Sequence, residues 1–231
     1  MKQINNYILE KLHLNKDVKK VYYPNNKKEL IKIIKDLIKE RGCDANLNDI
    51  CTSNITTMSY LFEGLRHEIR NIDISKWDVS KVKDMDSMFQ DCNDFNCDLS
   101  NWDVSKVENM EFMFFNCNQF NSDLSKWDVH KVTNMDCMFS SCVNFESDLS
   151  NWNISKVTNT SMMFDDCKKF NSDLSKWNVS NVTHMFKMFS GCEKFNCDLN
   201  NWKLKPGLVD RANMFKDTPL ENNLPKWYEA N

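Results

Sequence analysis

The stretch WDVHKVTNMDCMFSSCVNFESDLSN, residues 127–151, decides the fold because its pattern returns along the chain at a fixed interval. All seven tryptophans of the 231-residue chain lie on one series with a spacing of twenty-five residues: Trp77, Trp102, Trp127, Trp152, Trp177, Trp202 and Trp227. Tryptophan is a rare residue, so one series that contains every copy establishes both the period and the phase of a tandem repeat.

Other apolar columns keep the same period around this tryptophan ladder. One unit contains Leu99, Trp102, Val104, Val107, Met110, Met113, Phe114, Cys117 and Phe120. A segment of this length cannot bury such a set by itself, so neighbouring units must stack and share one core. The stability of the protein is then a sum over the interfaces between neighbouring units.

Two hydrophobic spacings alternate within the unit. Trp102 and Val104 are two residues apart, as on one face of a short strand. The spacing then changes to three and four residues, as on a short helix, at Val107, Met110, Met113 and Phe114. We therefore predict an α/β repeat solenoid in which short parallel strands form one face and short helices form the other.

The segment VTNMDCMFSSCVNF at 132–145, with WDV at 127–129, resembles the BspA-like leucine-rich repeats. In particular it is similar to their tryptophan-bearing, twenty-five-residue variant, first described as a domain of unknown function in mycoplasma lipoproteins. The resemblance runs from about Ile50 to Trp227. It implies a leucine-rich-repeat-like solenoid and a surface or interaction protein without catalysis.

The N-terminal segment, residues 1–48, departs from the repeat and is predicted to form a basic α/β cap. A strand is indicated at 18–23, and a second helix between Asn26 and Gly42. A first helix is indicated by the spacing of Ile4, Tyr7, Ile8 and Leu12. The cap carries 11 Lys and Arg against 6 Asp and Glu, a net charge of +5, whereas the remainder carries 19 against 27, a net charge of −8.

The repeat region has predicted boundaries on both sides. Residues 49–205 are expected to form the solenoid, and residues 206–231 a C-terminal capping turn. Three of the four prolines fall in this last stretch: Pro206, Pro219 and Pro225. Proline has no amide hydrogen to donate, so these residues block a further strand from pairing with the open edge.

The ten cysteines do not indicate a metal centre. Five of them form a ladder at the repeat period and take the place of a small buried apolar residue: Cys92, Cys117, Cys142, Cys167 and Cys192. No CxxC pair occurs, so we expect no metal site. We expect reduced thiols, with a Cys43–Cys51 pair as the oxidised alternative.

A column of aspartates, which includes Asp98 and Asp123, also recurs at the repeat period. This column predicts Asx-turns, because a calcium ladder would need more than the four glycines present.

Catalysis is disfavoured by the scatter of the polar residues. The four histidines occupy unrelated positions, and no phosphate-binding glycine loop is present, so we expect no catalytic residue, no cofactor and no small-molecule substrate. No apolar run reaches the roughly eighteen residues of a membrane span. The N-terminal residues lack a secretory hydrophobic region, which favours a cytoplasmic protein, with the cell surface as the alternative.

Residues that break the repeat indicate where a partner would bind. Ten residues after the tryptophan, at a position that the motif leaves free, three adjacent turns carry apolar groups: Phe112, Cys137 and Met162. Phe115 and Phe186 are further off-pattern aromatics. If Phe112, Phe115, Met162 and Phe186 face solvent, they form an exposed patch typical of a protein contact. The other interpretation is that they pack between neighbouring helices.

The sequence therefore favours a non-catalytic repeat scaffold that mediates protein–protein interaction with an unknown protein partner. The alternative is a surface adhesin or ligand-binding protein exported by an unrecognised route. A third hypothesis, nucleic-acid binding through the basic N-terminal cap, is the least favoured, because the lysines there lie opposite the apolar stripe as on any solvated helix.

Overall fold

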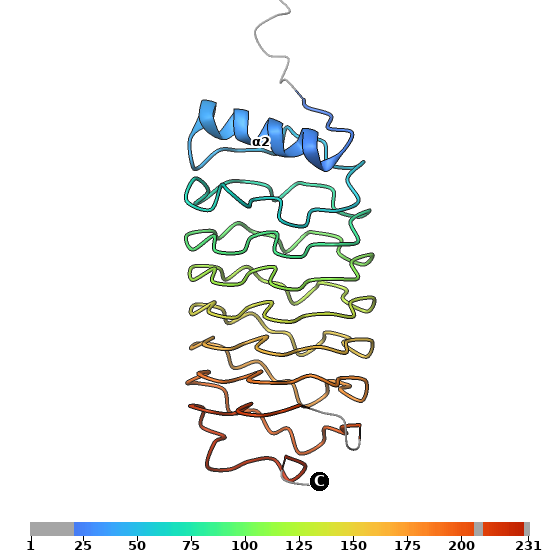
Figure 1. Ribbon diagram of the computed structural model, residues 1–231, viewed down its shortest axis with the longest axis vertical. Coiled ribbons are helices and arrows are strands. Elements are labelled where there is room, and N and C mark those ends of the chain that lie inside the picture. The colour runs from blue at the N-terminus through green and yellow to red at the C-terminus, as the bar shows by residue number, and fades with distance from the viewer. Residues whose placement is uncertain (1–20, 206–209, 229–231) are drawn as a thin grey trace, which may run out of the picture.

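The computed structural model describes residues 21–205 and 210–228 of the chain. This part of the chain winds into one stack of flat turns, and the helix α2 (Lys27–Arg41) lies across the N-terminal end (Figure 1). Successive turns meet at a row of isolated parallel bridges: Thr57–Asp84, Asp84–Asn109, Asn109–Asn134, Asn134–Asn159, Asn159–His184 and His184–Asp210. Equivalent residues of neighbouring repeats therefore lie side by side.

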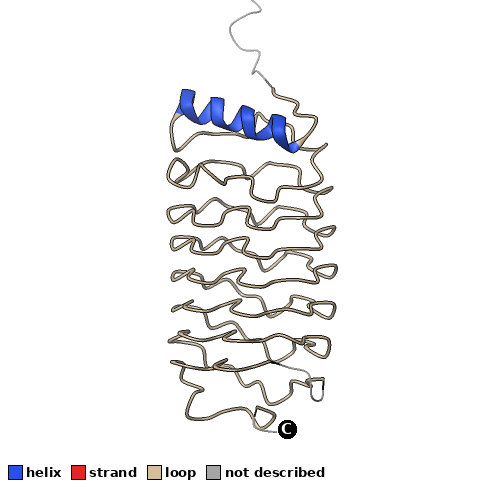
Figure 2. Ribbon diagram, in the orientation of Figure 1, coloured by secondary structure: helices blue, strands red, loops and turns tan. Residues whose placement is uncertain are grey.

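The prediction of an α/β solenoid with strands on one face and helices on the other is wrong. Within residues 21–205 and 210–228 the only helix is α2, and the isolated bridges are not extended into strands (Figure 2). The expected strand at 102–104 is loop, and the expected helix at 107–114 is loop and turn with an isolated bridge at Asn109. Each repeat is a chain of tight turns.

Left-handed residues prevent the predicted helices. Each complete repeat contains two of them, four residues apart, such as Phe112 with a φ of 50° and Asn116 with a φ of 59°. A right-handed helix cannot pass through a residue in this region. The apolar spacing of three arises instead from successive β-turns, in which the amide of Met113 donates to the carbonyl of Met110 at 3.3 Å and that of Cys117 to Phe114 at 3.0 Å.

Between turns, every second amide donates to the neighbouring turn. The amides of Met110, Phe112 and Phe114 donate to carbonyls twenty-four residues ahead, at 3.0, 2.8 and 2.9 Å. The amides between them donate within their own turn: that of Glu111 to the Asn109 side-chain oxygen at 3.2 Å, and that of Met113 to the Met110 carbonyl in a β-turn. The contact between turns is therefore parallel, but no strand forms, because the β-turns and the left-handed residues keep the backbone from extending.

The N-terminal cap is only partly described. The predicted first helix and residues 18–20 of the predicted strand lie outside the described residues. At 21–23 there is no strand but a single bridge, Tyr22 to Ile50. The predicted second helix is confirmed as α2: the Asn26 side chain accepts from the Glu29 amide, and Gly42 ends the helix with a φ of 85°. Its buried residues Leu30, Ile34, Leu37 and Ile38 cover the end of the stack.

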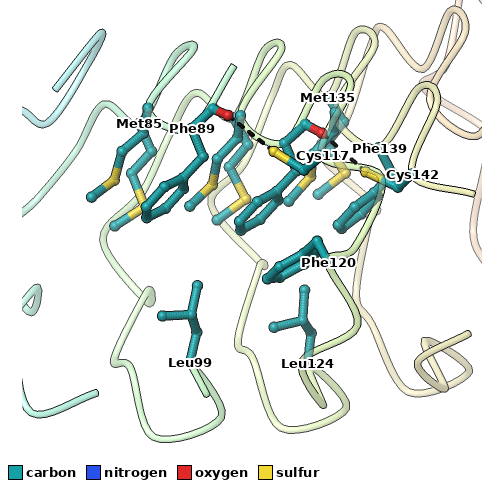
Figure 3. Packing of buried hydrophobic residues seen from close by; sticks show 14 of the residues in the cluster. Met85, Phe89, Leu99, Cys117, Phe120, Leu124, Met135, Phe139 and Cys142 are labelled. Atoms are coloured by element: carbon teal, nitrogen blue, oxygen red, sulfur yellow. Dashed lines mark hydrogen bonds between the residues drawn. The ribbon is translucent and has the colours of Figure 1, made fainter. Parts of the chain in front are cut away.

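The core is built from columns of identical side chains. Phe114 stacks on Phe89 and Phe139 of the adjacent turns, with ring centroids 5.4 and 5.6 Å apart. Figure 3 shows Phe89 and Phe139 in this column. A second phenylalanine column runs beside it, in which Phe120 lies 4.0 Å from Phe114 within the same turn. These rings are fully buried, and offset stacking at such distances is favourable.

The tryptophan ladder joins each turn to an earlier one. Six indoles, from Trp77 to Trp202, are 3–4 % exposed, and Trp227 is half-buried. The indole Nε1–H of Trp127 donates to the carbonyl of Leu99 at 3.0 Å, and that of Trp152 to Leu124 at 2.9 Å. Each ring thus buries a large apolar area while its polar atom is satisfied across the interface.

Replacing a central indole should destabilise the protein strongly. We expect Trp127→Ala to lower the free energy of unfolding by roughly 3 to 5 kcal/mol, because it removes a buried ring and leaves a cavity. Urea denaturation followed by circular dichroism measures this loss. Trp227→Ala is the control, since the half-buried ring at the end of the stack should cost less; an equal cost at both sites would contradict the burial argument.

The repeat length should be a structural unit. Excising residues 128–152 joins Trp127 to Asn153 in register, so we expect a shorter but folded stack with cooperative thermal unfolding. Excising only residues 128–140 breaks the alternation of amides between turns and should prevent cooperative folding. Equal tolerance of the two deletions would show that the interfaces do not depend on register.

Candidate functional site

One side of the stack carries side chains that differ from turn to turn. We call it the ribbon face: the residues seven to fourteen positions after each tryptophan whose side chains are not in the core. In one turn they are Asn109, Glu111, Phe112, Phe115 and Asn116, all of them half-buried, whereas the intervening Met110, Met113 and Phe114 are fully buried. The β-turns and the ladder between turns hold this face rigid on both sides.

The structure brings the four predicted partner-binding residues together as two pairs on the ribbon face. Phe112 and Phe115 pack edge to face, with ring centroids 5.5 Å apart. Met162 and Phe186 lie on adjacent turns, where the Met162 amide donates to the Phe186 carbonyl at 2.7 Å. All four side chains are half-buried, whereas Cys137, on the turn between the two pairs, is buried.

Two of these residues occupy a costly backbone conformation. Phe112 and Met162 have φ values of 50° and 48°, in the left-handed region that glycine and asparagine adopt most readily. Such a conformation costs an ordinary residue about 1 to 2 kcal/mol. The second left-handed column is recognisable from most of its residue types, Asp91, Asn116, Asp166 and Gly191, whereas in the first column only Asn213 gives such a signal.

A column of carboxylates directly precedes the column of Phe112 along the chain, a feature that the sequence analysis missed. Asp86, Glu111 and Asp136 occupy one column on three consecutive turns, nine residues after the tryptophan, and Asp84 lies nearby. Burial raises the pKa of Glu111, and the charges of Asp86 and Asp136 raise it further. Asp165, on the next turn, also has a raised pKa, chiefly because of its burial. The periodic Asp86, Glu111 and Asp136 column was the signal available in the sequence.

The aspartate column lies at a different corner of each turn and has a structural role. Asp98 accepts from the Ser100 amide at 2.9 Å, and Asp123 accepts from the Ser125 amide at 2.9 Å, which confirms the predicted Asx-turns. Shallow grooves run between these corners, and the one beside Asp148 and Asp173 also contains Lys169 and Lys176. No group of three potential metal ligands gathers in the described part of the chain.

The cysteine ladder donates hydrogen bonds within the core. The thiol of Cys117 donates to the Phe89 carbonyl at 2.9 Å, and that of Cys142 donates to the Phe114 carbonyl at 3.0 Å (Figure 3). Burial raises the pKa of Cys92 to about 12 and that of Cys117 well above its ordinary value. A thiol that stays protonated is neither a good nucleophile nor a good metal ligand. All ten cysteines, including Cys43 and Cys51, are free.

Thiol labelling should separate the two classes of cysteine. In the native protein we expect iodoacetamide to modify the half-exposed Cys43 and Cys51 first, while the buried Cys117 and Cys142 react only at the rate of unfolding. Peptide mass spectrometry gives the rate at each residue, and labelling in urea is the control in which all sites react. Rapid native labelling of Cys142 would show that the ladder is accessible.

Comparisons with known proteins give a family but no activity. A family model described as "Mycoplasma protein of unknown function, DUF285" matches residues 34–141 and again residues 121–227. No curated protein matches the chain, and no solved structure does. In the described residues there is also no helix both long and apolar enough to cross a membrane.

The family match confirms the predicted tandem repeat and its likeness to the mycoplasma domain of unknown function. It gives no support to the BspA-like name. Because the two matched segments together cover most of its length, the chain belongs to the family described as Mycoplasma protein of unknown function, DUF285.

Proposed function

We propose that this protein is a non-catalytic scaffold that binds another protein through its ribbon face. The observation that carries the proposal is the Phe112–Phe115 pair, which is half-buried on a rigid, hydrogen-bonded surface. Aromatic side chains on a rigid surface lose little conformational entropy when a partner covers them, and they dominate the binding energy of many interfaces.

The backbone cost at Phe112 and Met162 supports the same proposal. The column that contains them also accepts Ser87, Cys137 and Lys187 in the same left-handed conformation, so the turn itself does not require a bulky apolar side chain. A large apolar residue at this position, where asparagine would be less strained, lowers the stability of the folded protein. Contact with a partner is a function that would compensate for that loss.

Other classes of function fit the surface less well. An aromatic platform for sugars would need accessible indoles, and the indoles from Trp77 to Trp202 are buried. Nucleic acid would be repelled by the carboxylates of the ribbon face. The protonated, buried thiols of the cysteine ladder offer no nucleophile.

Removing the aromatic pair should weaken capture of a partner without unfolding the protein. We expect Phe112→Asn with Phe115→Ser to reduce by at least about tenfold the protein that the chain retains from a lysate of its native source, since two anchor side chains are lost. Because asparagine tolerates the left-handed backbone, the melting temperature should change little. Quantitative mass spectrometry of the retained proteins and a thermal melt measure the two effects.

The matched control is Tyr60→Asn. Tyr60 occupies the equivalent left-handed position in the first turn, with a φ of 52°, and it is 44 % exposed. This variant should retain the same proteins as the wild type. Equal retention by all three proteins, or a large loss of stability in the Phe112 and Phe115 variant, would overturn the proposal.

A further inference from the structure

Building on the proposed function, we infer that the partner of the ribbon face is a cationic protein segment whose arginines lie over the Phe112–Phe115 pair and reach the carboxylate column formed by Asp86, Glu111 and Asp136. The apolar pair supplies the contact area. The charges around the pair select the occupant.

The three carboxylates form a continuous row on the ribbon face. The Ser87 amide donates to the Glu111 carbonyl at 2.8 Å, and the Phe112 amide donates to the Asp136 carbonyl at 2.8 Å, so the turns that carry the row are in direct contact. Neighbouring hydrogen-bonded segments lie roughly 4.8 Å apart, which brings successive carboxylates within strong repulsion of one another. The row thus concentrates negative charge next to Phe112.

No cation of the described residues neutralises this row. The ion pairs within residues 21–205 and 210–228 involve other carboxylates, such as Asp91 with Arg66 at 3.0 Å and Glu108 with Lys83 at 3.5 Å. Glu111 instead accepts a neutral hydrogen bond from the Asn134 amide group at 2.8 Å. Burial raises the pKa of Glu111, and repulsion from Asp86 and Asp136 raises it further, so a bound cation would relieve the repulsion between these carboxylates.

Arginine fits this surface better than a metal ion or a lysine. Its guanidinium group stacks on an aromatic face and also donates paired hydrogen bonds to a carboxylate, and Phe112 and Glu111 are adjacent residues. The chain contains a weaker example of the same chemistry, since the Lys187 ammonium lies 5.7 Å from the Phe186 ring centroid. A metal ion would find no group of three ligands in the described part of the chain.

The spacing of the apolar pairs favours a polypeptide over a small cation. Phe112 and Met162 lie two turns apart, which corresponds to roughly 10 Å. An extended segment spans this distance with about three residues, so one peptide can cover both pairs, cross Asp136 on the turn between Phe112 and Met162, and reach Asp165 on the turn of Met162. A small cation could occupy the carboxylates but would leave the apolar pairs exposed.

The test uses two fluorescein-labelled peptides of equal length, one alternating arginine with leucine and the other alternating glutamate with leucine. Fluorescence anisotropy with the full-length protein should show binding of the arginine peptide only. Glu111→Lys with Asp136→Lys should weaken this binding at least about tenfold and create measurable binding of the glutamate peptide. Circular dichroism verifies that the variant folds.

The control variant has the same change in net charge elsewhere. Glu68→Lys with Glu146→Lys alters two exposed carboxylates away from the ribbon face, and it should leave the preference for the arginine peptide unchanged. Equal weakening in both variants would mean that the peptide responds only to net charge, and would overturn the inference. Light scattering that shows self-association lost in the Glu111 and Asp136 variant would identify a second copy as the occupant and also overturn it.

The experiments distinguish failure of the cationic-partner inference from failure of the proposed function. If Phe112→Asn with Phe115→Ser weakens peptide binding and partner capture while the charge-reversed variant does neither, the ribbon face binds a protein but not a cationic one. If partner capture is unaffected by either pair of substitutions, the ribbon face is not the binding surface and the proposed function fails as well.

Discussion

Along the segment that carries the ribbon face, every second backbone amide donates to a carbonyl of the next turn. The rest of the stack depends on this alternation. Phe112 and Phe114 donate across the interface at 2.8 and 2.9 Å, while Met113 between them donates back into its own turn at 3.3 Å. A shift of one residue would exchange the two sets of donors and leave both unpaired. Burying unpaired amides is costly, so the ladder holds the repeat at twenty-five residues.

This constraint places each side chain of the core beside its own copy in the next repeat, which is why the inward columns vary so little. A phenylalanine meets a phenylalanine at 5.4 to 5.9 Å along the column that contains Phe114. Polar atoms of the core also find their hydrogen-bond partners in a neighbouring repeat. The Trp152 indole donates to the Leu124 carbonyl at 2.9 Å, and the Cys142 thiol donates to the Phe114 carbonyl at 3.0 Å. A close-packed core therefore requires no helix and no strand in the repeats.

The ribbon face is free of this packing requirement, and its chemistry changes from turn to turn. The left-handed position accepts residues as different as Phe112, Cys137 and Lys187, because the ladder imposes the backbone conformation whatever the side chain. A surface of this kind can acquire binding residues at a modest cost in stability. The aromatic pair and the row of carboxylates beside it have the composition expected of a site for one class of partner.

The period, the phase, the inward columns and the capped helix at 27–41 follow from the sequence alone, because each depends on local residue types that recur or on a cap such as Asn26. The off-pattern residues Phe112 and Phe115 were also recognisable there. The conformation of the repeat was not, because apolar residues three and four apart suit successive β-turns as well as a helix. The left-handed backbone at Phe112, and the burial and repulsion that raise the pKa of Glu111, arise only when neighbouring turns are in contact, since both depend on groups twenty-four or twenty-five residues away in the chain.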